Sequence, residues 1–133
     1  MDRLFLDANV LFSAAYRRDA GLLQLWKLSN VTLCSSRYAV EEARINLVEQ
    51  SQRTRLDKLS KNLQLFDAPP RDLPKGIFLP EKDLPILLAA IEARATHLLT
   101  GDIRHFGQYL GKMVAAGIAV LRPAEYLKLD AGS

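Results

Sequence analysis

Four acidic side chains stand at positions where the chemistry of a functional site is expected. Asp7 and Asp102 each follow a short apolar run, Asp83 precedes a segment with helical spacing, and Glu42 lies within a charged helical segment. Carboxylates that share a pocket repel one another, and a bound divalent cation removes that cost. The residue types therefore indicate a metal-assisted hydrolysis, provided that the fold brings these acids together.

Each acid also has a simpler interpretation. Asp7, Asp83 and Asp102 could be helix N-caps, because an aspartate there accepts hydrogen bonds from the first turn. Glu41 and Glu42 are adjacent, and both could belong to a solvent-exposed helix face. Taken singly, these interpretations are at least as good as a functional one, but three acids at one expected sheet edge favour a shared site.

Short apolar runs alternate with helical patterns along the chain. Strands are predicted over residues 4–6, 31–34, 63–66, 97–100 and 118–121. Helices are predicted over residues 8–15, 21–28, from a Ser35 or Ser36 cap through 50, 53–61 after a Ser51 cap, from about 83, 108–115, and from Pro123. This alternation predicts an α/β fold, a three-layer α/β/α sandwich with a central parallel sheet. Ligands bind at the carboxyl edge of such sheets.

The composition is that of an ordinary globular protein, with 49% hydrophobic and 25% charged residues in 133. The range 67–82 holds four prolines and one glycine, and we interpret it as a stiff loop within a single domain, 1–133. No run is long enough to span a membrane, no signal peptide is evident, and the single Cys34 fits a reducing cytoplasm. One cysteine and two histidines cannot form a closed zinc site. The net charge of +3 is too small to indicate nucleic-acid binding by itself.

Residues 21–28 contain more apolar side chains than one helix face requires. The segment could be wedged between the sheet and its neighbours, which is the interpretation that we favour slightly. The alternative is a partly exposed patch that binds a partner.

Four motifs, taken in order, resemble those of the PIN-domain family. They are Leu6–Leu11, Tyr38–Leu47, Asp83–Leu87 and Leu99–Phe106. Each motif is weak alone, but together they cover nearly the whole chain. The resemblance implies a cytoplasmic Mg²⁺- or Mn²⁺-dependent endoribonuclease that acts on RNA. It further implies a VapC-like toxin of a type II toxin–antitoxin pair, with a cognate antitoxin protein and a homodimeric state.

The resemblance also assigns roles to particular residues. It makes catalytic metal ligands of Asp7, Glu42 (preferred to Glu41), Asp83 and Asp102. Asn9 and Thr100 match the polar residues that orient the first and last acids by hydrogen bonds. Apart from the resemblance, Arg104, Arg44 and Arg37 are candidates for binding flanking phosphates, provided that they lie near the pocket. Many relatives carry a further acid shortly after Asp102, where this chain has Arg104 and His105.

Two other functions are compatible with the same residues. A non-catalytic PIN-like RNA-binding or scaffold protein is the main alternative, although the intact acids argue against it. Phosphoryl transfer through an aspartyl-phosphate at Asp7 commonly uses a second acid two residues later, where this chain has Asn9.

Overall fold

The computed structural model describes residues 1–69, 77, 79–102, 106, 109, 113–114 and 117–131. Its strands are β1 (Asp2–Leu6), β2 (Val31–Ser36), β3 (Gln64–Phe66), β4 (His97–Leu99), β5 (Met113–Val114) and β6 (Ile118–Leu121). Its helices are α1 (Ala8–Tyr16), α2 (Arg37–Asn46), α3 (Gln50–Ser60), α4 (Leu84–Glu92) and α5 (Pro123–Ala131), with two 3₁₀ helices, Gly21–Lys27 and Glu81–Asp83.

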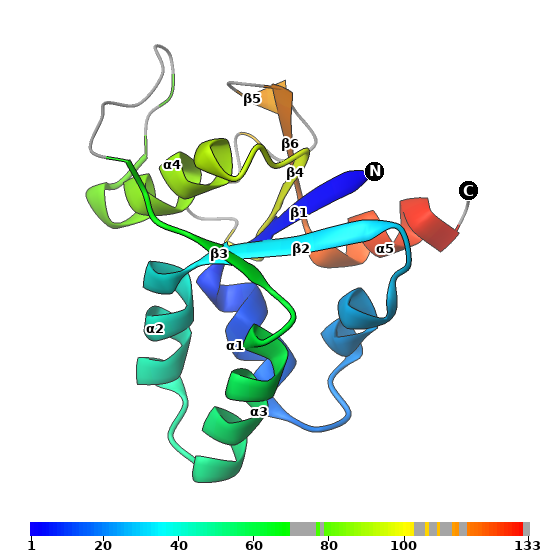
Figure 1. Cartoon of the computed structure of the whole chain (residues 1–133), viewed down its shortest axis with the longest axis vertical. Coiled ribbons are helices and arrows are strands. Elements are labelled where there is room, and N and C mark those ends of the chain that lie inside the picture. The colour runs from blue at the N-terminus through cyan, green and yellow to red at the C-terminus, as the bar shows by residue number, and fades with distance from the viewer. Residues whose placement is uncertain are drawn as a thin grey trace.

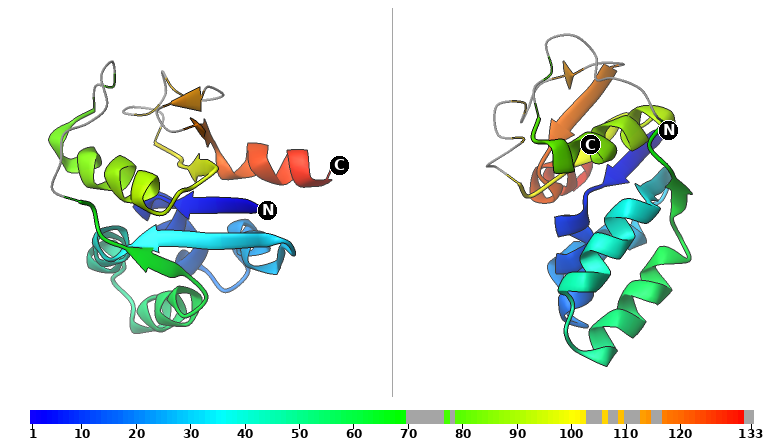
Figure 2. Two further views of the ribbon diagram at one scale, coloured as in Figure 1. Left: turned by 45° about the horizontal axis from the view of Figure 1, so that its top comes forward. Right: turned by 90° about the vertical axis from the view of Figure 1, so that its left-hand side faces the viewer.

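The strands form one sheet in the order β3-β2-β1-β4-β6-β5 (Figure 1). The first five of these pair in parallel, and β5 pairs antiparallel with β6. Helices α1, α2 and α3 lie on one face of the sheet and α4 lies on the other, as Figure 2 shows. The predicted α/β sandwich with a central parallel sheet is therefore confirmed.

The central strand β1 carries the middle of the core. Leu4, Phe5 and Leu6 are fully buried, since the strand has a neighbour on either side and helices on both faces. Helix α4 contributes Ile86 and Leu87 to the same core. Such burial fixes the register of β1, so the residue that follows it is placed with little freedom.

The prediction of a helix over 108–115 is wrong at Met113 and Val114. Met113 and Val114 form β5 instead, paired with Ala119 and Ile118 of β6. Gly117 adopts a φ of +73°, a left-handed conformation that glycine tolerates and that suits the turn before β6. Helical and strand patterns cannot be distinguished in so short an apolar run.

The prediction of one continuous helix through residue 50 is also wrong, as is the Ser51 cap. Helix α2 begins after Ser36, whose hydroxyl accepts a hydrogen bond from the Ala39 N–H (3.0 Å), and it ends at Asn46. Leu47 then leaves the helical conformation and is fully buried. Burial of this leucine in the core therefore accompanies the break, and α3 starts at Gln50.

The apolar segment Gly21–Lys27 packs onto the core. Leu25 is fully buried, and the indole N–H of Trp26 donates to the Leu59 carbonyl of α3 (3.1 Å). Leu22 also packs against the core, and α5 lies beside the segment. These contacts account for most of its apolar side chains. They support the interpretation that the segment is wedged between the sheet and its neighbours. Within the part of the chain that the structure describes, no helix is long and apolar enough to cross a membrane.

Candidate functional site

The candidate site lies where the strand order reverses, at the carboxyl ends of β1 and β4. From β1 the chain proceeds to β2 on one side, whereas β4 flanks β1 on the other. Leu6 pairs with Leu99 in register, so Asp7 and Thr100, the next residues, emerge side by side. The Asp7 N–H donates to the Leu99 carbonyl (3.1 Å). Crevices at such reversal points are the usual ligand sites of open α/β sheets.

The two carboxylate oxygens of Asp7 have different partners. Oδ1 accepts from the Ala8 N–H (2.7 Å) at the start of α1. Oδ2 accepts from the Thr100 hydroxyl (2.8 Å) and from the Asn9 side-chain amide (3.2 Å). With 4% of its surface exposed, Asp7 is thus a helix cap and a fixed, buried carboxylate at once. The two interpretations drawn from the sequence do not exclude each other.

Thr100 and Asn9 connect the turn after β4 to the start of α1. The Thr100 hydroxyl oxygen also accepts from the Asp102 N–H (3.0 Å), and the Asn9 Oδ1 accepts from the Gly101 N–H (2.8 Å). A Cβ at Gly101 would lie 3.4 Å from that Asn9 oxygen, which is van der Waals contact. This network sets the position of Asp102 relative to Asp7, as expected for polar residues that orient ligands.

The four predicted acids line one pocket of about 400 Å³, hereafter the acidic pocket. Its walls are Asp7, Ala8, Asn9, Phe12, Glu42, Ala43, Asn46, Lys82, Asp83 and Asp102. These residues come from α1, α2, the 3₁₀ turn before α4 and the turn after β4. The tertiary structure therefore brings together acids that lie far apart in the sequence.

The environment of the acidic pocket raises the pKa of Asp7 to about 6 from its usual 3.8. Burial is the main cause, because it penalises the charged form. The hydrogen bonds from Thr100 and Ala8 act in the opposite direction, and the negative charges of Asp83 and Asp102 raise the pKa further. The three aspartates thus interact electrostatically. A cation among them would offset both the cost of burying the Asp7 charge and the repulsion between the carboxylates.

Asp83 is positioned by the turn that opens α4. It is 7% exposed, and its side chain makes no capping hydrogen bond to that helix. The Tyr38 hydroxyl donates to the Lys82 carbonyl (2.8 Å), which ties α2 to this turn. Desolvation raises the pKa of Tyr38, followed by the charges of Glu42, Asp83 and Asp7, so the phenol lies close to the acids.

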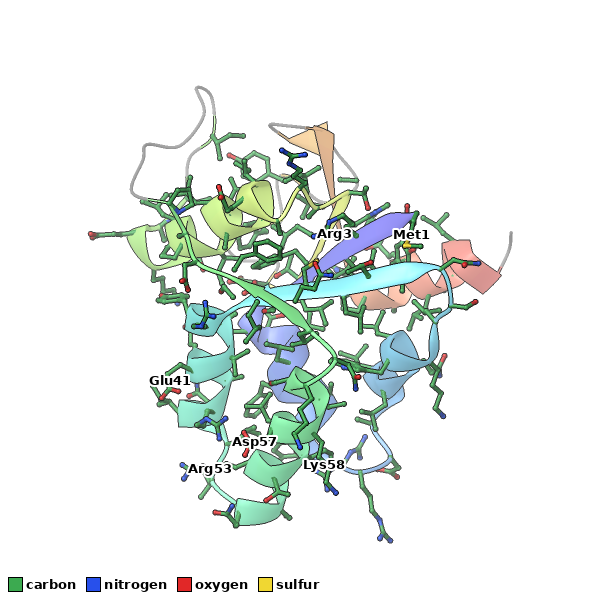
Figure 3. The ribbon with its side chains drawn as sticks, in the orientation of Figure 1. Met1, Arg3, Glu41, Arg53, Asp57 and Lys58 are labelled. Carbon is green, nitrogen blue, oxygen red and sulfur yellow. The ribbon has the colours of Figure 1, made fainter. Side chains whose placement is uncertain are left out.

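The two adjacent glutamates of α2 have different surroundings. Glu42 lines the acidic pocket, whereas Glu41 does not and is directed outward in Figure 3. Glu41 lies 3.8 Å from the Arg44 guanidinium, which also pairs with Asp57 of α3. Arg44 is therefore held toward α3 and is not among the walls of the acidic pocket, while its expected role in substrate binding stays a prediction. The geometry favours Glu42 as the helix acid.

Sequence reasoning missed Lys82, an exposed lysine on the wall of the acidic pocket. Its position directly before Asp83 was the available signal. Arg104, another proposed phosphate-binding residue, and His105 lie outside the residues that the structure describes. Lys82 supplies a positive charge beside the acids.

The donor set of the acidic pocket suits Mg²⁺ or Mn²⁺, which prefer carboxylate oxygens. Among the described residues, no three acid, histidine or cysteine side chains already converge as a preassembled metal cluster. Mg²⁺ does not require one, because it commonly uses one or two carboxylates and completes its shell with water and substrate phosphate. Such a cation would be most strongly stabilised beside Asp7, whose buried carboxylate lies near the negative charges of Asp83 and Asp102.

Comparison with known proteins agrees with this geometry. A family model described as PIN domain matches residues 3–104. Similar solved structures include VapBC2 from Rickettsia felis bound to a DNA fragment from their promoter, at 18% identity and a TM-score of 0.67 over 90% of this chain and 98% of that one. FitAB bound to the IR36 DNA fragment is similar at 18% identity and a TM-score of 0.51, over 90% and 94%. FitAcB from Neisseria gonorrhoeae is similar at 19% identity and a TM-score of 0.51, over 91% of this chain and 98% of that one.

No curated protein matches the chain in sequence. At these identities the solved structures establish a shared fold, and the family model supplies the sequence relationship across most of the chain. The chain belongs to the PIN-domain family.

Proposed function

We propose that the protein is a Mg²⁺- or Mn²⁺-dependent endoribonuclease that hydrolyses RNA phosphodiesters. One observation carries the proposal: Asp7, Glu42, Asp83 and Asp102, from four separate parts of a PIN-domain chain, line a single pocket at the reversal point of the sheet. PIN domains are in general nucleases. RNA as the substrate rests on the family resemblance.

The side chains of the acidic pocket have two roles, metal binding and the orientation of a metal ligand. Asp7, with Glu42, Asp83 and Asp102, would hold the cation. A bound divalent cation supplies the positive charge that lowers the pKa of water and stabilises the leaving oxygen. Thr100 fixes the Asp7 carboxylate by donating to its Oδ2, so the ligand geometry requires little reorganisation on binding.

The walls also bear on how an anionic substrate approaches. Four acids repel a phosphodiester in the metal-free protein, whereas Lys82 attracts it from the same pocket. Lys82 would contact a phosphate oxygen and so orient the scissile group. Productive binding of RNA therefore requires the cation first, and RNA affinity should rise with Mg²⁺.

We further propose that the protein is the toxin of a type II toxin–antitoxin pair, inhibited by a cognate antitoxin and assembled as a homodimer. The similarity of its fold to VapBC2 and FitAB supports the antitoxin partner, and the homodimer rests on the family resemblance alone. Expression of the gene alone, and together with any short reading frame found beside it, tests this proposal. Growth arrest that is relieved by the neighbour is the expected result, and harmless expression alone would contradict it.

The nuclease proposal is tested by RNA cleavage with purified protein and Mg²⁺. Glu42→Gln and Glu41→Gln form a matched pair, since the residues are adjacent on α2 but only Glu42 lines the acidic pocket. We expect Asp7→Asn and Glu42→Gln to lose at least about 100-fold in rate, and Glu41→Gln to keep the rate of the parent. Equal cleavage by parent and Asp7→Asn would refute the assignment.

The non-catalytic alternative predicts a different result. Calorimetric titration of Mn²⁺ into the parent and into Asp7→Asn separates the two functions. Binding that the substitution weakens supports the nuclease, because the carboxylate contributes both charge and a ligand atom. Absence of Mn²⁺ binding, together with RNA binding but no cleavage, would favour an RNA-binding or scaffold module.

A further inference from the structure

We infer that a second hollow, next to the acidic pocket, is a subsite for the substrate nucleotide that neighbours the scissile phosphate. The inference rests on the proposed nuclease function and extends it to the path of the strand. The hollow measures about 500 Å³ and is lined by Val10, Ser13, Leu22, Arg122 and Pro123, among others. Its volume falls within the range of about 300–1,000 Å³ that is usual for ligand pockets. It is called the side hollow below.

The side hollow is continuous with the acidic pocket through two shared residues. Asn9 and Asp102 line both cavities. Helix α1 separates them: Phe12 faces the acidic pocket, whereas Val10 and Ser13 face the side hollow. A strand whose phosphate lies at Asp102 would therefore have its adjacent nucleotide at the side hollow.

The two cavities differ in chemistry, as the parts of a nucleotide do. The acidic pocket presents carboxylates, which suit a cation and a phosphate. The side hollow presents mainly apolar walls from Val10, Leu22 and Pro123, which suit the flat face of a base or the carbon atoms of a ribose. The Ser13 hydroxyl and the Asn9 side chain line it as polar groups.

Arg122 supplies the charge that a phosphate requires. Its backbone N–H donates to Glu125 Oε1 (3.3 Å), while its guanidinium forms no ion pair with any residue in the described ranges. Lys82 lines the acidic pocket and Arg122 lines the side hollow, so each cavity has a positively charged side chain. Asp102 borders both cavities. Contacts to phosphate position a strand without reading its sequence, and we expect this subsite to discriminate weakly between bases.

The test compares kcat/KM for oligouridylates of two, three and four nucleotides. The readout is the ratio of the longer to the shorter substrate, which reports an added subsite and is independent of the basal rate. A charge-assisted phosphate contact corresponds to a gain of about tenfold or more on one extension. Arg122→Gln should reduce that ratio toward one. Ala124→Trp, which fills the side hollow from an exposed position on α5, should do the same.

Arg17→Gln is the matched control, because Arg17 is an exposed arginine that lines neither cavity. Its ratio should equal that of the parent. Equal ratios in the parent, Arg122→Gln and Ala124→Trp would overturn the subsite even if all of them cleave RNA.

A binding measurement separates failure of the subsite from failure of the nuclease. Fluorescence anisotropy of a labelled tetrauridylate is measured in Asp7→Asn protein with excess Mg²⁺, since slow cleavage in this variant leaves the substrate intact. Weaker binding on adding Arg122→Gln, but not Arg17→Gln, supports the subsite even if no variant cleaves RNA. Equal affinities in all three proteins would overturn it.

Discussion

Replacement of Asp7 by asparagine should stabilise the metal-free protein near neutral pH. In the folded protein the pKa of Asp7 is raised to about 6, mainly by burial, from 3.8. The folded state therefore holds the proton more tightly than the unfolded state. The contribution of Asp7 to stability is fully present below about pH 4, is lost as the pH rises from about 4 to about 6, and stays lost above that interval. An asparagine does not ionise and avoids this loss.

The magnitude follows from the two pKa values. A tenfold change in proton affinity corresponds to about 1.4 kcal/mol, so the ionisation of Asp7 costs about 3 kcal/mol at pH 7.5. An asparagine has one acceptor oxygen in place of two, and it disturbs the contacts with Thr100 or Asn9 at Oδ2. That disturbance costs about 1 kcal/mol. The net gain expected for Asp7→Asn at pH 7.5 is about 2 kcal/mol.

Urea unfolding of both proteins in EDTA, from pH 4 to pH 8, measures this gain. The free energy of unfolding of the parent should fall relative to that of Asp7→Asn between about pH 4 and about pH 6, and the difference should stay constant above that interval. Addition of Mn²⁺ at pH 7.5 should stabilise the parent more than the variant, since binding to the folded state adds to its stability. Asp7→Asn should thus be the more stable protein and the less active enzyme.

Parallel pH curves for the two proteins would refute the reasoning, because they would mean that Asp7 ionises as easily in the fold as in the unfolded chain. A variant that is less stable than the parent at pH 7.5 would mean that the hydrogen bonds of Asp7 outweigh its burial. Asp57→Asn serves as a control, since that aspartate is half-exposed and lies outside the acidic pocket. This variant shows whether replacing a carboxylate outside the acidic pocket by an amide produces the same change.

Three further substitutions test the surroundings of the acids. Thr100→Val keeps the shape but removes the hydroxyl that orients Asp7, and should cost about 1–3 kcal/mol in urea unfolding and weaken Mn²⁺ binding in calorimetry. Tyr38→Phe removes the hydrogen bond to the Lys82 carbonyl, and should weaken Mn²⁺ binding while unfolding changes by at most about 1.5 kcal/mol. Arg44→Ala breaks exposed ion pairs, and should cost under about 1 kcal/mol without slowing RNA cleavage; a large loss of rate would support its role in substrate binding.

The local sequence was sufficient where one pattern dominated. The apolar run before Asp7 predicted a buried strand, and the spacing after Asp83 predicted helix α4, whose start the structure confirms. It was insufficient at Leu47 and at Met113–Val114. A buried leucine accompanies the break between α2 and α3, and pairing with β6 makes a strand of a short apolar segment. Both outcomes depend on distant neighbours, which a local pattern does not report.

The sequence by itself determined which residues could do chemistry: four acids in the order of the PIN motifs, with Asn9 and Thr100 beside two of them. Only the tertiary structure decided which residues share a cavity. It placed Glu42 rather than Glu41 in the acidic pocket, added Lys82, and directed Arg44 toward α3. The physical reason is that, where one pattern dominates, composition and periodicity fix the type of an element and its buried face. The neighbours of a side chain at the end of a strand depend on strand order and register, which the whole chain sets.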